Sequence, residues 1–326
     1  MTELSLVQAV NAALRYAMNE DPRVLVLGED VGVDGGVFRA TEGLFAEFGE
    51  QRVLDTPVAE ASIAGVSIGL AAQGFRPVAE IQFTGFAYAC IDQIINHASR
   101  LRCRTRGRLT CPMVLRAPAG GGIKAVEHHS ESPEAMFAHI PGIKVVMPSS
   151  PARAYGLLLS AIRDPDPVVF LEPTRLYRAA REDVSDDGAG LPLQRCFTLR
   201  PGRHLTIVAW GAMIKEALEA ADQLAAENID AEVVDVATLK PLDGAAILAS
   251  VTRTGRLVVV QEAPMTCGYG AEIVARVCHG ALTSLLAPIE RVTGYDTMMP
   301  YLRTEAAYMP NVARVVAAAR RVMAYA

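Results

Sequence analysis

Glu60 stands at the head of a run of small apolar residues, an uncommon place for a carboxylate. Residues 54–83 read LDTPVAEASIAGVSIGLAAQGFRPVAEIQF. The small side chains at 61–72 allow another backbone or a flat ligand to approach closely. Burial against such a surface raises the pKa of a carboxyl group and suits it to proton transfer near neutral pH. Glu60 is therefore a candidate acid–base residue.

A structural role for Glu60 is the alternative. Thr56 and Pro57 form a good N-cap and first-turn pair, which predicts a helix start at that point. A reciprocal capping box would place its acid at position 59, one residue before Glu60. Glu60 would still interact favourably with the helix dipole, by roughly a few tenths of a kcal/mol. The spacing alone leaves both roles open.

Two further segments carry groups that could do chemistry. Glu29 directly follows the apolar run VLVLG, at the strand end where open α/β sheets bind their ligands. A solvated acid at a strand end is the alternative. Residues 119–135, AGGGIKAVEHHSESPEA, place two histidines after three glycines. This composition predicts a mobile loop, with Ser132 and Pro133 capping the next helix.

The elements that must position these residues alternate along the chain. Short apolar runs predict strands covered on both faces at 24–28, 78–83, 112–118, 143–147 and 167–172. Helical patterns lie at 60–73, 87–102 and 133–139, and an amphipathic helix with Glu3 near its start is expected at the N-terminus. Alternating strands and helices predict an α/β fold with a doubly wound parallel sheet.

A second, smaller α/β domain is expected after a linker. Residues 178–193 are charged and lack apolar periodicity. We place the first domain at 1–180, the linker at 181–193 and the second domain at 194–326. In the second domain, strands are expected at 205–211, 231–236, 257–262 and 288–294.

Composition narrows the class of protein. The chain has 326 residues, of which 51% are hydrophobic, and this suits one large or two medium domains. A net charge of −5 with interspersed signs offers no basic face for nucleic acid. No apolar run reaches the roughly 20 residues of a membrane span, and the N-terminus lacks a secretory signal pattern. The six cysteines form no CxxC pair, so we expect reduced thiols in a cytoplasmic protein.

Several colinear segments resemble the β subunit of the thiamin-diphosphate-dependent 2-oxo acid dehydrogenases, and the branched-chain type in particular. They are LGEDVG with GGVFR at 27–39, DTPVAE at 55–60, SPEAMFAH with PGIKVV at 132–146, LYRAA at 176–180 and APIERVTGYDT at 287–297. The resemblance implies a thiamin pyrimidine-binding first domain and a second domain of the transketolase C-terminal type. It also implies oxidative decarboxylation of a branched-chain 2-oxo acid. Pyruvate or acetoin dehydrogenase β subunits and a non-catalytic assembly subunit are the alternatives.

The resemblance also implies roles for individual residues. Glu60 would contact the ring nitrogen of the cofactor's aminopyrimidine, with Glu29 beside it. His129 would orient the substrate and donate a proton during acyl transfer. The remaining contacts implied for cofactor or substrate are Val58, Gln82, Phe83 and Phe86.

One position departs from the branched-chain pattern. Those relatives tend to carry tyrosine where Phe86 stands, so a hydroxyl contact is missing here. Tyr88 could supply a hydroxyl instead, or it could be a packing residue.

The chain carries only part of the expected machinery. It contains no Gly-Asp-Gly motif, so the resemblance implies that Mg²⁺ and the diphosphate bind to a separate α subunit in an α₂β₂ assembly. The acyl group would pass to a lipoyl-bearing dihydrolipoamide acyltransferase. A K⁺ ion is also expected near Met113–Val114 and the turn that contains Ala161, Asp164 and Asp166.

Overall fold

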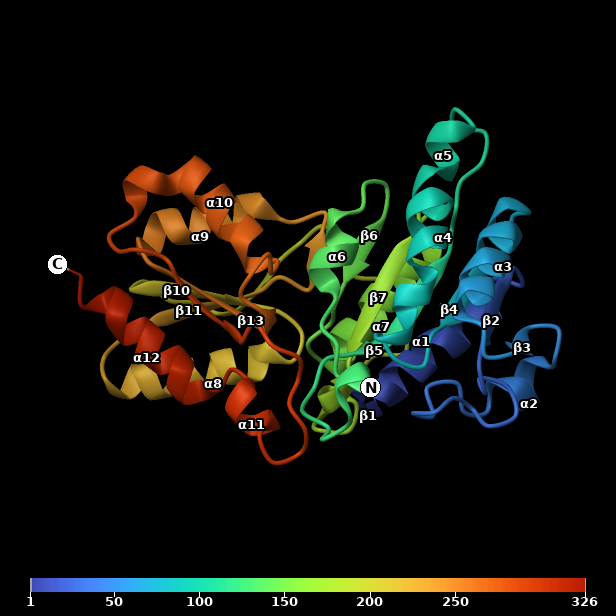
Figure 1. The fold of residues 1–326 in the computed structure, drawn as a ribbon, viewed down its shortest axis with the longest axis horizontal. Helices are drawn as coiled ribbons and strands as arrows, with labels where there is room; N and C mark the ends of the chain where they lie inside the picture. The colour runs from blue at the N-terminus through green and yellow to red at the C-terminus, as the bar shows by residue number, and fades with distance from the viewer. Residues whose placement is uncertain (1, 326) are drawn as a thin grey trace.

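Runs of valine, isoleucine and leucine form the strands of two main sheets in the computed structural model, which describes residues 2–325. Each sheet lies in its own lobe, and the N-terminal and C-terminal lobes lie side by side (Figure 1). The predicted two-domain α/β fold class is confirmed. No helix within residues 2–325 is both long and apolar enough to cross a membrane.

The N-terminal lobe is built on a seven-stranded sheet whose inner strands are buried. In spatial order the strands are β12 (Thr238–Lys240), β6 (Lys144–Val146), β7 (Val168–Pro173), β5 (Val114–Ala119), β4 (Arg76–Glu80), β2 (Val24–Gly28) and β3 (Val53–Asp55). All neighbours are parallel except β12 and β6, which are antiparallel. The carboxyl ends of the parallel strands therefore share one edge.

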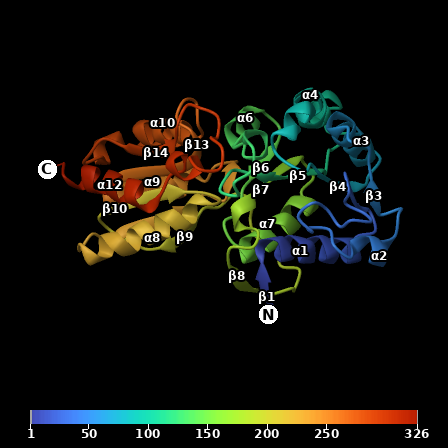
Figure 2. The same ribbon diagram turned by 60° about the horizontal axis from the view of Figure 1, so that its bottom comes forward.

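Helices cover both faces of this sheet. One face packs against α1 (Leu6–Glu20), α2 (Leu44–Phe48) and α7 (Pro151–Arg163). The other face packs against α3 (Glu60–Ala72), α4 (Ile91–Asn96) and α6 (Glu134–His139). Figure 2 shows α1 below the sheet and α3 and α4 above it. The prediction had no helix at α7, although Ser150 caps its start and Pro151 occupies the first turn.

The C-terminal lobe repeats this layering around five strands. Their order is β14 (Glu290–Gly294), β13 (Leu257–Pro264), β10 (Leu205–Ala209), β11 (Ala231–Asp235) and β9 (Phe197–Arg200), with β9 antiparallel. One face packs against α8 (Met213–Ala226) and α12 (Val312–Met323), and the other against α9 (Gly244–Thr254) and α10 (Gly270–Ala281). A short helix, α11 (Glu305–Tyr308), precedes α12.

The two lobes are joined by more than the connecting chain. Strand β12 comes from the C-terminal half of the chain and pairs with β6 at the edge of the N-terminal sheet. A single apolar cluster also runs through both lobes, and it includes the buried Trp210. These contacts couple the C-terminal lobe to the sheet that carries the predicted site.

The structure differs from the sequence prediction in three local details. Glu3 belongs to strand β1 (Thr2–Ser5), and α1 begins only after Ser5. Strand β1 pairs with β8 (Arg181–Val184), so the first residues of the predicted linker are ordered by a tertiary strand pairing. The predicted helix at 87–102 is broken at His97, where φ is −124° and ψ is −65°. It comprises two short 3₁₀ turns, α4 and α5 (Leu101–Arg104).

Candidate functional site

The predicted site residues gather at the carboxyl ends of neighbouring parallel strands. Glu29 follows β2, and Glu60 begins the helix after β3. Gln82 and Phe83 follow β4, and His129 lies in the loop after β5. Because β5, β4, β2 and β3 are adjacent in the sheet, these side chains stand along one edge of it. Open α/β sheets bind ligands in a crevice at this edge, and we use the word crevice for this place in the fold.

Two carboxyl groups lie close together in this crevice. Glu29 is 5% exposed, and burial raises its pKa. The negative charges of Glu60 and Asp30 raise it further, while a backbone hydrogen bond from Ala59 acts in the opposite direction. Glu60 is half-buried. A pair of acids in which one has a raised pKa is suited to holding and passing a proton.

Glu60 occupies the first turn of α3 without a capping partner. The N-cap residue is Ala59, and no side chain caps this helix end. The predicted cap at Thr56 is wrong, because the Thr56 amide donates to the Gly28 carbonyl oxygen (2.9 Å) and prolongs the β3 alignment with β2. The favourable dipole position of Glu60 therefore remains, but the capping explanation for this segment does not.

An aromatic cluster lines the crevice beside His129. The Phe83 ring is 9% exposed and lies 4.2 Å from the His129 ring between centroids. Phe86 and Phe38 contact Phe83 at 5.9 Å and 5.4 Å. Phe38 was missed by the sequence reasoning, although it belongs to the GGVFR segment. Together the rings form an apolar wall on the side expected to face substrate.

The other predicted contacts have distinct surroundings. Val58 is 82% exposed at the rim of the crevice. The Gln82 side-chain amide donates to the Asp30 carboxylate (2.9 Å), which orients it at the end of β4. The Tyr88 hydroxyl donates to the Glu131 carboxylate (3.0 Å). Tyr88 thus anchors the loop that carries His129, and its contact with the cofactor stays a prediction.

The glycine-rich segment before the histidines is packed against the C-terminal lobe. A β-carbon on Gly121 would lie 2.5 Å from the Met299 methyl group. Gly120 and Gly122 have φ values of 81° and 86°, which favour glycine. The predicted mobility of the loop stays a prediction. Ser132 does not cap α6, whose N-cap residue is Pro133. Its hydroxyl donates to the Glu262 carboxylate instead (3.3 Å).

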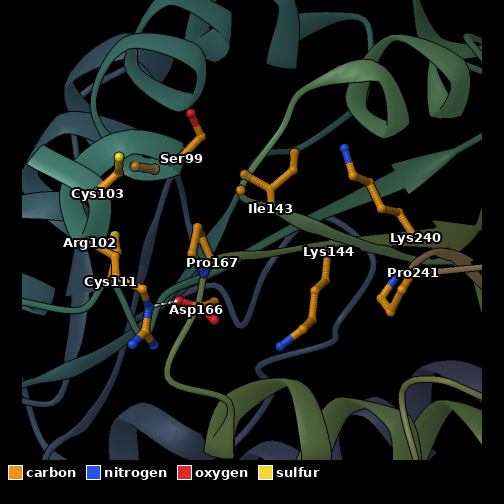
Figure 3. A pocket seen from close by; sticks show the side chains of 12 residues that line it. Ser99, Arg102, Cys103, Cys111, Ile143, Lys144, Asp166, Pro167, Lys240 and Pro241 are labelled. Atoms are coloured by element: carbon orange, nitrogen blue, oxygen red, sulfur yellow. Dashed lines mark hydrogen bonds and ion pairs between the residues drawn. The ribbon is translucent and has the colours of Figure 1, made fainter. Parts of the chain in front are cut away.

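The turn predicted to bind K⁺ has both aspartate side chains engaged by cations. Lys144 Nζ lies 2.6 Å from Asp164 Oδ1, and Arg102 Nε lies 2.7 Å from Asp166 Oδ1. The Asp166 pair borders a separate cavity of about 420 Å³ between α5 and β12 (Figure 3). A K⁺ ion would therefore depend on main-chain oxygens such as that of Ala161, which accepts from the Asp164 amide (3.3 Å). The K⁺ site stays a prediction.

Unpartnered polar atoms in the crevice fit a polar ligand. Glu29 Oε1, Thr56 Oγ1 and His129 Nδ1 are buried and have no hydrogen-bond partner within residues 2–325. Buried polar atoms are normally hydrogen-bonded, so these three atoms are available to the donors and acceptors of a polar ligand. A metal is less well matched, since no cluster of three His, Cys, Asp or Glu side chains in the described chain could hold one.

Comparisons with known proteins define the class. Residues 2–180 match the family described as transketolase, pyrimidine binding domain, and residues 195–315 match transketolase, C-terminal domain. A solved structure of a split gene transketolase, an inactive β4 tetramer, superposes with a TM-score of 0.82 at 25% identity over 99% of both chains. The chain therefore has the transketolase-type architecture, with a pyrimidine-binding first domain, and these domains support thiamin diphosphate as its cofactor.

Relatives identify the family within this class. The chain is 49% identical to the pyruvate dehydrogenase E1 component subunit beta of Bacillus subtilis, over 100% of both chains. It is 45% identical to the protein of the same description from Acholeplasma laidlawii, over 98% of both. The chain belongs to the β-subunit family of the thiamin-diphosphate-dependent 2-oxo acid dehydrogenases, as the resemblance implied. The branched-chain type is not supported, because these relatives are described as pyruvate dehydrogenases.

Proposed function

We propose that this chain is the β subunit of a 2-oxo acid dehydrogenase that decarboxylates pyruvate. The observation that carries the proposal is the set of side chains at this sheet edge: the paired acids Glu29 and Glu60, and an aromatic wall beside His129, whose Nδ1 has no hydrogen-bond partner within residues 2–325. The pyruvate dehydrogenase relatives support pyruvate over the branched-chain acids that the motifs favoured.

The side chains of the site would have separate roles in the reaction. Thiamin diphosphate supplies the electron sink for decarboxylation when it is bound. Glu60 would bind the ring nitrogen of the aminopyrimidine through a shared proton. Glu29 would lie beside it, with a pKa that burial and the charge of Glu60 raise. His129 Nδ1 is free to bond the substrate. The Phe83 wall excludes water from this side of the crevice.

The aromatic wall suits a small substrate. Phe38, Phe83 and Phe86 are large, fixed groups that pack against one another around His129. Pyruvate carries only a methyl group beyond its reacting carbonyl, whereas branched-chain acids need space for several more carbons. The wall thereby favours the smaller acid.

The function requires a partner chain. We assign the diphosphate and Mg²⁺ to an α subunit, in an α₂β₂ assembly, because this sequence carries no Gly-Asp-Gly motif. The acyl group then passes to the lipoyl group of a dihydrolipoamide acyltransferase. Residues 194–326 would supply the contact between β subunits and the surface for the acyltransferase.

Substrate competition tests the proposal. The chain is assembled with an α subunit, and kcat/KM is measured for pyruvate and for 3-methyl-2-oxobutanoate. We expect pyruvate to be preferred by about tenfold or more, since pockets discriminate by about 1–3 kcal/mol per methylene. A preference for the branched acid would refute the pyruvate assignment, and no decarboxylation of either acid would favour the non-catalytic assembly subunit.

A further inference from the structure

The loop that carries the two histidines is closed at its base by the N-terminal lobe. We call residues 120–132 the histidine loop. The Gly120 amide donates to the Glu131 carbonyl oxygen (2.8 Å), which joins the two ends of the loop. Thr84 Oγ1 donates to the same carbonyl (2.9 Å), and Tyr88 binds the Glu131 carboxylate. The base is therefore fixed to the lobe that forms the crevice.

The C-terminal lobe binds the loop through Glu262, at the end of strand β13. One oxygen, Oε1, accepts hydrogen bonds from the Gly121 amide (2.5 Å) and from the Ser132 hydroxyl (3.3 Å). Gly121 and Ser132 lie near opposite ends of the loop. A single carboxylate oxygen of the second lobe thus holds both ends together.

Glu305, at the start of α11, binds the next stretch of the loop. Its Oε1 accepts from the Gly122 amide (2.5 Å), and its Oε2 accepts from the Lys124 amide (3.0 Å). Lys124 has a φ of 59°, a left-handed conformation that costs a non-glycine residue about 1 kcal/mol or more. The contact with Glu305 holds the main chain in this strained shape.

Two of the three glycines of the loop lie close to side chains outside the loop. A β-carbon on Gly120 would lie 2.7 Å from Glu262 Oε1, and one on Gly122 would lie 2.6 Å from Arg175 Cδ. A side chain at Gly120 would collide with the Glu262 carboxylate, and one at Gly122 would collide with Arg175. Glycine at position 120 therefore permits the close approach of Glu262 to the loop.

The two carboxylates are buried, so each needs hydrogen-bond donors to offset the loss of hydration. Glu262 is 8% exposed and Glu305 is 4% exposed. The donors that reach the two carboxylates are main-chain amides and one hydroxyl, all from the histidine loop. A buried charge is tolerated when such donors surround it, and charge-assisted hydrogen bonds of this kind are strong.

We propose that Glu262 and Glu305 are positioning residues for His129, which they act on through the main chain of the histidine loop. The carboxylates of the C-terminal lobe fix the segment 121–124, and this segment sets the place of His129 against Phe83. The proposal rests on the role given to His129 under the proposed function. It makes the C-terminal lobe a determinant of active-site geometry as well as a surface for partners.

Amide hydrogen exchange tests the contact directly, in the full chain assembled with its α subunit. In Glu262→Ala and in Glu305→Ala, we expect the amides of 121–124 to exchange about 10-fold faster, as follows from loss of a charge-assisted hydrogen bond. Glu262→Gln retains an acceptor oxygen and should keep protection close to wild type. Glu227→Ala, which removes a surface partner of Arg320 in the same lobe, is the control and should leave the loop unchanged. Unchanged protection in both alanine variants would overturn the proposal.

Kinetics separate positioning from simple structural support. We expect kcat for acyl transfer to the lipoyl group to fall by about 10-fold to 100-fold in Glu262→Ala, as small misplacements of catalytic groups do. The KM for pyruvate and the affinity for thiamin diphosphate should stay near wild type, and Glu262→Gln should restore most of kcat. A loop that exchanges faster while kcat stays at the wild-type value would overturn the positioning role. Amide exchange needs no substrate, so the test distinguishes failure of the loop contact from failure of the proposed activity.

Discussion

Replacement of Glu134 by glutamine should remove a pH dependence of the free energy of unfolding that arises from the burial of this carboxyl group. Glu134 begins α6 and is 1% exposed. Burial raises its pKa from the ordinary 4.5 to about 7, while a hydrogen bond from Trp210 Nε1 (3.3 Å) opposes the rise. The negative charge of Glu262 adds to the rise. Trp210 is the single tryptophan of the chain, so its fluorescence reports on this carboxyl group.

The sign and size of the effect follow from these pKa values. Because the folded-state pKa lies above the unfolded one, the folded chain binds more protons between them. The stability that protonated Glu134 contributes is fully present below pH 4.5 and is lost as pH rises through about 7. The gap between the two pKa values corresponds to about 3 kcal/mol of unfolding free energy. Glu134→Gln keeps an uncharged group at this position and should escape this loss.

Fluorescence and unfolding measurements check this prediction. Trp210 emission in the folded wild-type chain should change with a midpoint near pH 7, and the change should be absent in Glu134→Gln. Urea unfolding at about pH 5 and about pH 8 should show that wild type loses up to about 3 kcal/mol more than the variant. Equal pH dependence in the two proteins would refute the burial argument for Glu134.

The remaining predictions concern the site and the ion. Glu60→Gln in the assembled enzyme should keep the fold and lower decarboxylation by about 10²–10⁴-fold, and a wild-type rate would reduce Glu60 to a helix-start acid. His129→Ala should slow transfer to the lipoyl group more than it weakens cofactor binding, so unchanged overall turnover would remove it from the mechanism. Replacement of K⁺ by a bulky organic cation should lower the thermal midpoint if the turn at Ala161 binds the ion, and an unchanged midpoint would count against the site.

Much of the fold could be predicted because most of its strands correspond to short runs of consecutive apolar residues in the sequence. VLVLG at 24–28 became β2 with the predicted bounds, since a strand buried on both faces is apolar throughout. Strand β12 could not be predicted in the same way. It is three residues long and joins β6 from about 90 positions away, a pairing that only the packed lobes reveal. Helix α7 was a missed signal, because Ser150 and Pro151 mark its start in the sequence.

In the candidate site too, some residues are marked by the local sequence, and others are recognised only from the packing of the two lobes. Glu29 could be singled out because it follows a strand, and the resemblance singled out Glu60 and His129, while the roles of all three stay predictions. Glu262 and Glu305 could not be identified from the sequence as contacts of the histidine loop. Nothing in the neighbouring sequence distinguishes them from other acids, and each binds a residue more than 100 positions away. The three consecutive glycines were the available signal for them, and their close-packing role requires knowledge of the second lobe.

The most direct test of the account is assembly of the active site from two chains. The purified chain is mixed with thiamin diphosphate, Mg²⁺ and pyruvate, first alone and then with a separately prepared α subunit. We predict no decarboxylation by the chain alone and weak cofactor binding, because under the proposed function the charged half of the cofactor would bind to the α subunit. Activity and tight cofactor binding should appear together when the two chains are present in equal amounts. Turnover by this chain without an α subunit would contradict the shared site.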